Sequence, residues 1–305
     1  MSKGQVQSTF IWLFAVIAGG AFLLIFFTVT QAQQEYIDNQ IMDTSSNLLQ
    51  DLIEVLASSD NTQRTIPAPP REIQFHCPAD NHEFIYAEST LRNTIPPLPV
   101  FTPPKLPTRP FTATSIDINP GQDIGQAIFF TPSDYTISIR PNTHSRVKQI
   151  IEQSPFNFNE SDSAPKIDFN TVSDSMNQIE RLWGTVEYDD GDRVGWVGES
   201  MLLGALISNS SSLYSCSAQS TKRLLEVAFD ITRVRSNLLS EEHSDCGQQY
   251  TDLSQNTDRP YYIGNVIDAI TFSGEKQELE AYVARLNSLD SFVLSDIRRA
   301  GCPDI

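Results

Sequence analysis

Residues 111–140, "FTATSIDINPGQDIGQAIFFTPSDYTISIR", decide the fold class because they contain three runs with the composition of β-strands. "FTATSIDI", "QAIFF" and "YTISIR" are rich in aromatic and β-branched residues, and residues typical of turns separate them. In the third run Tyr135, Ile137 and Ile139 alternate with polar residues, which is the period of a half-buried strand. The segment therefore predicts consecutive strands.

Helices are predicted between the strands that follow. The pattern indicates a short helix at 145–153, a strand at 166–169 and a helix at 173–183. "GTVEYDDGDRVGWVG", residues 184–198, predicts a hairpin or paired strands around the Asp-Gly turn. Strands that alternate with helices favour an α/β or α+β layer domain, which we assign to residues 111–210.

Residues 211–305 have a different pattern and predict a helical subdomain packed on, or continuing, the α/β layer. Long helices are expected at 220–239 and 276–299, and shorter ones at 246–253 and 266–272. The periodicity of the first is carried by five aliphatic residues: Leu224, Val227, Ile231, Val234 and Leu238.

Short strands and a proline-rich segment are predicted for residues 61–110. "REIQFHC" and "EFIYAE" are the strands, and "TIPPLPVFTPPKLPTRP" follows at 94–110 with seven prolines. Proline lacks the amide proton that helices and inner strands need, so this segment predicts an extended connector or a strap over the domain.

Residues 10–29 contain no ionisable side chain and would form a helix about 30 Å long, which matches the thickness of a bilayer core. The alternative is a cleaved signal peptide, with 30–32 as the cleavage site. Lys3 precedes the run and the next basic residue is Arg64, so the positive-inside rule leaves residues 1–9 in the cytoplasm. We therefore expect a single-pass cell-membrane protein with its main domain extracellular.

Residues 30–60 are predicted to continue the membrane helix outward as a stalk. Apolar residues recur there at helical spacing: Ile37, Ile41, Leu48, Leu52 and Val55. Leu49, Ile53 and Leu56 widen this face and are expected to dock on the domain. A coiled coil is disfavoured because the pattern lasts under three heptads.

"SKGQVQSTF", residues 2–10, resembles the class III signal of archaeal type IV pilin precursors. In that family a peptidase cuts between the residues that correspond to Gly4 and Gln5, and the apolar helix becomes the stem of a filament. This chain departs from the pattern, since Thr9 stands where the family usually has a Glu. The alternative is an ordinary signal anchor. The whole layout also resembles uncharacterised archaeal single-span surface proteins, for which no activity is established.

The net charge of −17 limits the partners that the chain can have. Its 21 basic residues divide into 15 Arg and only 6 Lys. An acidic, lysine-poor surface argues against nucleic acid and anionic lipid as partners. It would suit a salt-rich medium, in which charges are screened, or simply keep the domain soluble.

The four cysteines all follow the predicted membrane span, and an even count outside the cell predicts two disulfides. Cys246 lies just past the helix predicted at 220–239, and a helix pair that runs down and up would return Cys302 beside it. Cys77 is then left for Cys216. A zinc site at His76, Cys77 and His82 is the alternative, although no CxxC or HxxxH motif accompanies them.

The chain has no catalytic motif that we recognise: GxSxG, the P-loop and GxGxxG are all missing. We therefore predict no catalytic residue, cofactor or metal. Asp189, Asp190 and Asp192 offer oxygen ligands for calcium, but they lack the spacing of a twelve-residue loop and indicate a solvated turn. Asn159 and Asn209 begin Asn-x-Ser sequons and are predicted glycosylation sites.

Three functions are compatible with these features. The first is a non-enzymatic envelope protein, anchored through residues 10–29, whose disulfide-bonded domain contacts other envelope proteins. The second is a pilin-like subunit, and the third is an ectoenzyme with an unrecognised site. The sequence does not determine the oligomeric state.

Overall fold

The computed structural model describes residues 62–69, 71–78, 83–86, 92–95, 98–119, 124–174, 179–255 and 276–288, with isolated positions from 28 to 56 and from 297 to 302. It divides the chain into two units, residues 1–49 and 50–305. In the first unit the described positions, among them Thr28, Tyr36 and Gln40, are helical. Nothing in the described part of the chain forms a helix long and apolar enough to cross a membrane. The predicted span, residues 10–29, lies outside the described residues apart from Thr28.

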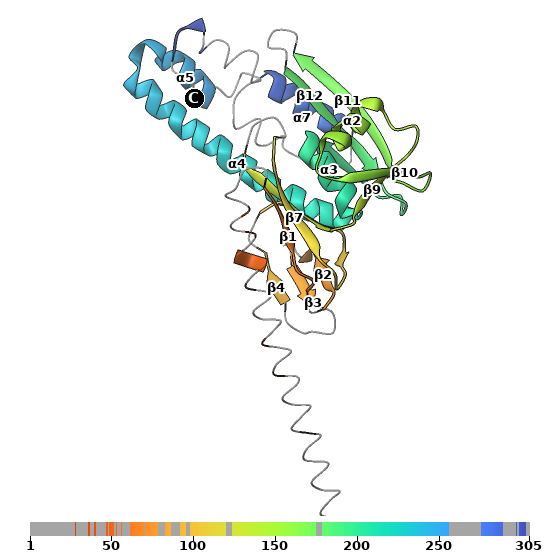
Figure 1. Ribbon diagram of the computed structural model, residues 1–305. Helices are drawn as coiled ribbons and strands as arrows, with labels where there is room; N and C mark the ends of the chain where they lie inside the picture. The colour runs from red at the N-terminus through yellow and green to blue at the C-terminus, as the bar shows by residue number, and fades with distance from the viewer. Residues whose placement is uncertain are drawn as a thin grey trace, which may run out of the picture. The chain divides into compact units, whose positions relative to one another are not determined.

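The second unit is a mixed α/β fold, as the sequence predicts at that level (Figure 1). Its first four-stranded sheet has the order β1 (Gln63–Ile66), β7 (Phe111–Asp117), β8 (Gln126–Pro132), β5 (Val100–Phe101). The second has the order β4 (Arg92–Thr94), β3 (Glu83–Tyr86), β2 (Ile73–His76), β6 (Lys105–Leu106). The strands predicted in "FTATSIDI" and "QAIFF" are confirmed as the adjacent antiparallel pair β7 and β8.

The proline-rich segment supplies one edge strand to each of these sheets. β5 pairs only with β8, and β6 pairs only with β2, within the described strands. Edge positions are where a sheet tolerates proline, because the outer side of an edge strand makes no ladder hydrogen bonds. The predicted strap is therefore an extended segment that joins two sheets.

The βαβ segment follows, in which β9 (Thr136–Ile139) and β10 (Asn157–Glu160) pair in parallel. The helix predicted at 145–153 lies between them and is confirmed as α2 (Ser145–Gln153). Its N-cap is His144, whose Nδ1 accepts a hydrogen bond from the Arg146 amide at 3.1 Å. Val147, Ile150 and Ile151 form its buried face.

A three-stranded antiparallel sheet is formed by β11 (Lys166–Asp174), β12 (Ile179–Glu187) and β13 (Arg193–Val197). The helix predicted at 173–183 is therefore wrong. Both faces of the central strand β12 are covered, so the neighbours Leu182 and Trp183 are each buried, in two different hydrophobic clusters. Adjacent buried residues do not show the alternation of a half-exposed strand, and the pattern resembles that of a helix. The hairpin predicted at 184–198 is confirmed, with its turn at residues 188–192.

Helix α3 (Glu199–Ser208) is the centre of the larger cluster. Every residue from Ser200 to Ser208 is buried, and the helix contacts β5, β8, β9, β12 and β13. Gly204 brings the α3 backbone against the Phe101 ring, where an added Cβ would lie 2.4 Å from the ring. This helix is not predicted from the sequence, because a helix that is apolar all round has no amphipathic period.

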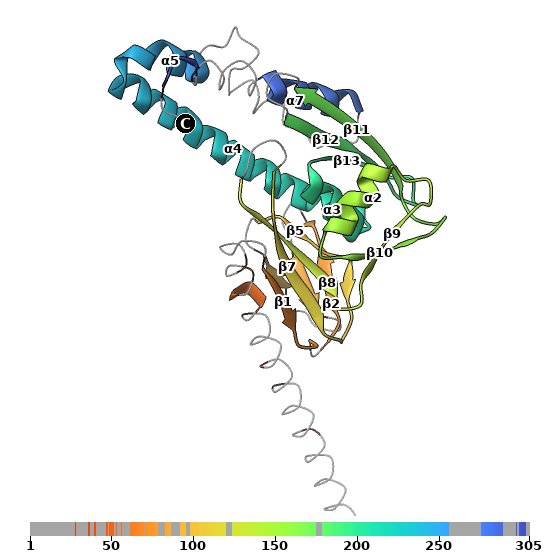
Figure 2. The same cartoon turned by 45° about the horizontal axis from the view of Figure 1, so that its top comes forward.

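Helix α4 (Ser211–Glu242) is much longer than the predicted 220–239. Its first part is buried beside α3, and the remainder packs on α5 (Gly247–Gln255) (Figures 1 and 2). A 3₁₀ turn, η2 (Ser244–Cys246), joins α4 to α5. The smaller hydrophobic cluster contains side chains from α4, α5, the outer face of β12–β13 and α7 (Lys276–Ser288). The helix predicted at 276–299 is described to Ser288, and the one at 266–272 lies outside the described residues.

Two disulfides, Cys77–Cys216 and Cys246–Cys302, connect these parts. They are the pairs that the sequence argument favoured. Cys216 lies inside α4 rather than before it, so the first disulfide fixes the chain after β2 to the buried part of this helix. The second joins the residues after α4 to the end of the chain.

Candidate functional site

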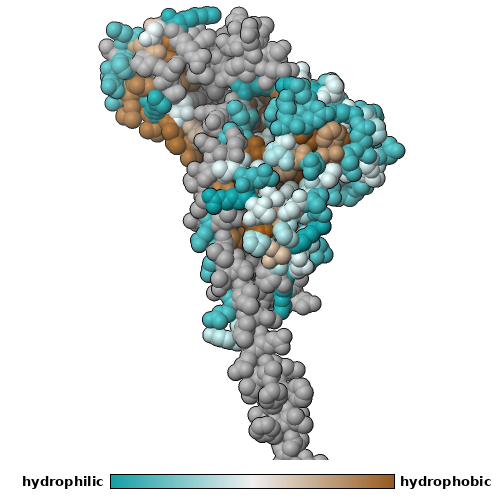
Figure 3. Space-filling view, in the orientation of Figure 1, coloured by the Kyte–Doolittle hydropathy of each residue, from teal (hydrophilic) through white to brown (hydrophobic). Residues whose placement is uncertain are grey.

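Helix α4 has two apolar faces, and among the described residues one face is packed while the other is exposed. Leu225 and Phe229 are buried in the smaller cluster. On the opposite side four large aliphatic side chains are exposed: Val227 by 55%, Ile231 by 62%, Val234 by 54% and Leu238 by 60%. Among the described residues, the other exposed large hydrophobic side chain is Tyr36, in the first unit. Figure 3 shows hydrophobic residues gathered along α4.

The spacing of these residues places them in one line along the helix. With the half-buried Leu224 they form a set that we call the α4 stripe, at steps of three, four, three and four residues. That is the a/d spacing of a coiled-coil seam. Single exposed aliphatic residues are ordinary, but contiguous apolar surfaces mark binding sites on soluble domains.

These same five residues carry the helical period from which the helix at 220–239 is predicted. The helix is confirmed, but the stripe points to solvent while other residues of α4 pack inside. The buried face of α4 includes small polar residues that a hydropathy pattern does not mark. Ser236, for example, is fully buried, and its hydroxyl donates a hydrogen bond to the Tyr250 carbonyl at 2.8 Å.

Charges beside the stripe differ in sign from those of the chain as a whole. Residues 222–238 contain four basic and two acidic side chains, whereas the chain has a net charge of −17. Asp230 forms an ion pair with Arg233 at 2.6 Å, and Lys222 lies 4.0 Å from Glu226. The stripe is therefore bordered by charged groups of both signs, as the seam of a helix–helix interface usually is.

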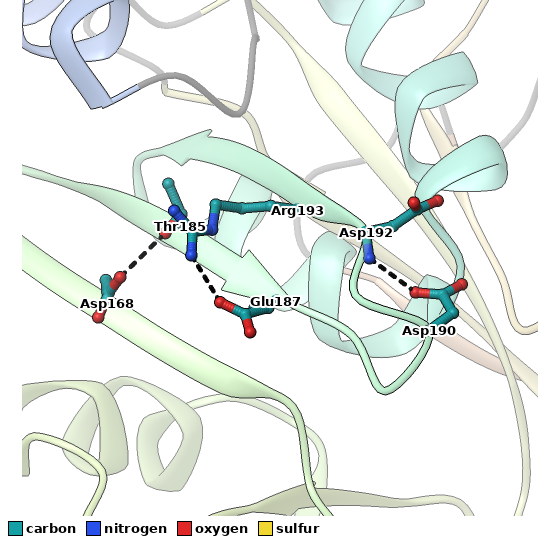
Figure 4. Close-up of polar contacts among 6 residues, drawn as sticks. All are labelled: Asp168, Thr185, Glu187, Asp190, Asp192 and Arg193. Atoms are coloured by element: carbon teal, nitrogen blue, oxygen red, sulfur yellow. Dashed lines mark hydrogen bonds and ion pairs between the residues drawn. The ribbon is translucent and has the colours of Figure 1, made fainter.

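The hairpin β12–β13, which contains the predicted acidic turn, is the main alternative site (Figure 4). The Asp192 amide donates to Asp190 Oδ1 at 3.0 Å, which closes the turn, and the Ser211 hydroxyl donates to the Asp192 carboxylate. Arg193 donates to Glu187 at 2.6 Å, and this bond lowers the pKa of the Glu187 carboxyl. Asp190 and Asp192 therefore form hydrogen bonds within and beside the turn, and Glu187 pairs with the residue opposite it on β13. These contacts agree with the prediction of a solvated turn.

The other residues considered from the sequence do not converge. His76 ends β2, His144 caps α2 and His243 follows α4, while His82 lies outside the described residues. Cys77 is in a disulfide, so its thiol is not available to zinc. In the described ranges no group of three or more His, Cys, Asp or Glu side chains is placed to hold a metal ion.

The predicted modification sites fall into two classes. Asn159, on β10, and Asn209, which ends α3, are both exposed. Gly4 and Gln5, the predicted processing site, lie outside the described residues.

Comparison with protein-family models, curated proteins and solved structures found no match to this chain. The α4 stripe is therefore the feature on which a functional argument can be built.

Proposed function

We propose that this protein is a membrane-anchored, non-enzymatic surface protein whose external domain binds other proteins through the α4 stripe. The observation that carries the proposal is the line of five aliphatic side chains, four of them more than half exposed, on a helix whose opposite face is already packed. A protein in water gains free energy when such a surface is covered. The aliphatic, uncharged centre and the charged border favour an amphipathic helix as the partner.

Two further features support a location outside the cell. The two disulfides together contain all four cysteines of the chain. Disulfides persist in oxidising compartments. Asn159 and Asn209 are exposed, as acceptors of glycans must be. In this proposal residues 10–29 anchor the chain, residues 30–60 form the stalk, and the mixed α/β unit with its C-terminal helices lies outside.

Site-specific photo-crosslinking in intact cells tests the binding surface. A photoreactive residue at position 231, in the stripe, is expected to give specific protein adducts. The same residue at position 226 is the control, because Glu226 lies on the charged border of the same helix and is paired with Lys222. Equal adduct yields at the two positions would contradict the proposal.

Protease added to intact cells tests the topology separately. The external domain is expected to be degraded while about the first thirty residues are protected. A protected full-length chain, beside an accessible control protein that is cleaved, would show that the orientation is wrong.

A further inference from the structure

We infer that the partner of the α4 stripe is a second copy of this chain, bound as a short parallel coiled coil of two α4 helices. This inference rests on the proposed binding role of the stripe and names its partner. The surface offered is an exposed row of aliphatic side chains on a helix, and the surface that best matches its spacing is the same row on another copy.

The spacing supplies the first argument. Leu224, Ile231 and Leu238 occupy the a positions of a heptad, and Val227 and Val234 occupy the d positions. In a parallel pair each a residue meets its own counterpart and each d residue meets its own counterpart. Five successive layers would therefore be apolar on both sides. The residues of α4 that pack inward, Leu225 and Phe229, are at b and f positions and stay in their own core.

The flanking charges supply the second argument and select the parallel orientation. Asp230 is at a g position and Arg235 is at the following e position, and both are exposed. In parallel coiled coils a g residue of one helix faces the e residue five positions later on the other helix. Asp230 of each copy would thus face Arg235 of the other, which gives two pairs of opposite charge. An antiparallel pair would bring Arg235 beside Ala228 instead and lose this complementarity.

The third argument is electrostatic and concerns the whole surface. Two copies that each carry a net charge of −17 repel one another over most approaches. Residues 222–238 carry four basic and two acidic side chains, so two copies that meet at this face do not bring together the acidic excess of the chain. Two heptads make a weak coiled coil in free solution. Anchoring in one membrane would raise the effective concentration of the copies and favour the pair.

Thiol crosslinking of the full-length protein, purified in detergent or present in cells, tests the geometry. Val227→Cys is expected to give a dimer with a short bismaleimide, a reagent that leaves the native disulfides intact. Glu226→Cys is the matched control, since it stands next in the chain but on the border, and it should give little dimer. In an antiparallel pair the two 227 positions would be about 16 Å apart, and the product would instead come from mixing Val227→Cys with Leu238→Cys chains. That mixed product without the Val227→Cys homodimer would overturn the parallel pair.

Substitutions test the energetics in the same protein. Ile231→Gln combined with Val234→Gln should weaken self-association at least 100-fold without lowering the melting temperature, because both side chains are exposed and Gln is a good helix former. Lys222→Gln with Glu226→Gln is the control, because these two residues lie beside each other rather than beside Asp230, and it should leave association within about threefold. Asp230→Arg should weaken the dimer, and adding Arg235→Asp should restore it.

The outcomes separate the two proposals. Adducts at position 231 with other proteins but never with this chain would overturn the self-association and leave the proposed function standing. If position 231 gives no adduct and position 227 also gives no dimer, both proposals are overturned.

Discussion

Replacing Gly184 with Ala should destabilise the domain severely, because β12 is the central strand of its sheet. A Cβ at position 184 would lie 1.9 Å from the Asp168 carbonyl oxygen on one neighbouring strand. It would also lie 2.9 Å from the Trp196 side chain on the other. Backbone cannot rotate aside as a side chain can, so β11 must move and its pairing with β12 must loosen.

Overpacking usually costs about 1–3 kcal/mol, and a clash with backbone belongs at or above the top of that range, so we expect about 3 kcal/mol. For a domain of this size that is a fall in melting temperature of roughly 6–12 °C. Circular dichroism measures it, and the near-ultraviolet signal of Trp196 should change as well.

Gly247→Ala is the matched control for this experiment. It starts α5, and its Cβ would lie 3.3 Å from the Ser240 carbonyl oxygen, which needs only a small adjustment. Alanine favours a helix over glycine, so the free energy of unfolding should change by less than about 1 kcal/mol. A Gly184→Ala protein that melts within about 2 °C of the wild type would refute the reasoning about β12.

Three further predictions concern the packing that holds α3 and α4. Gly204→Ala should lower the free energy of unfolding by about 2 kcal/mol in denaturant titrations, less than Gly184→Ala, because the Phe101 ring can shift. Replacing both Cys246 and Cys302, which are 56 residues apart, with Ser should lower the free energy of unfolding by about 4 kcal/mol in the chain-entropy model. The same replacement of Cys77 and Cys216, which are 139 residues apart, should lower it by about 5 kcal/mol. A smaller loss of stability for the longer loop would contradict that model. Three tyrosine hydroxyls donate hydrogen bonds to backbone carbonyls: Tyr135 to Ile207, Tyr188 to Ala205 and Tyr214 to Gly195. Burial raises the pKa of Tyr135 to about 12 and also raises the pKa values of Tyr188 and Tyr214. Because unfolded tyrosine ionises near pH 10, the stability from these groups is complete below that pH and should fall above it by up to roughly 1.4 kcal/mol per tyrosine per pH unit. Tyr135→Phe should remove the contribution of one tyrosine from the slope measured between pH 10 and 11.

The periodicity of apolar residues predicts those helices and strands in which one face is buried and the other is exposed to solvent. Strand β9 and helix α2 belong to this class, since their alternation or helical period is visible in the sequence. Strands β7 and β8 are buried along most or all of their length, and they were predicted instead from their β-branched and aromatic composition between turn residues. Periodicity failed in β12 and α3, two elements that are buried on both sides. In β12 the adjacent Leu182 and Trp183 are covered by different layers, and in α3 every side is covered.

The α4 stripe shows a further limit of sequence patterns. Periodicity identified its residues correctly but could not say whether the neighbour that covers them belongs to the same chain. Leu225 and Phe229, with the small Ser236, make the inner face, and only the arrangement of α5 and α7 decides which of the two faces is inner. A helix with two apolar faces is therefore recognised from its sequence as a helix, but which of its faces is exposed is recognised only in the fold.

The way in which α4 is held bears directly on how well the stripe can bind. A segment as short as residues 224–238 would be only marginally helical by itself in water, and a partner would have to supply the free energy of ordering it. Here the start of α4 is buried beside α3 and joined to Cys77, while its end is packed on α5 next to the Cys246–Cys302 disulfide. Both ends of the stripe are thus fixed by contacts that do not involve its own side chains. The helix is ordered before binding, so covering the aliphatic row contributes to affinity without a cost of folding α4. This order before binding is what the proposed interface, a seam of only two heptads, requires.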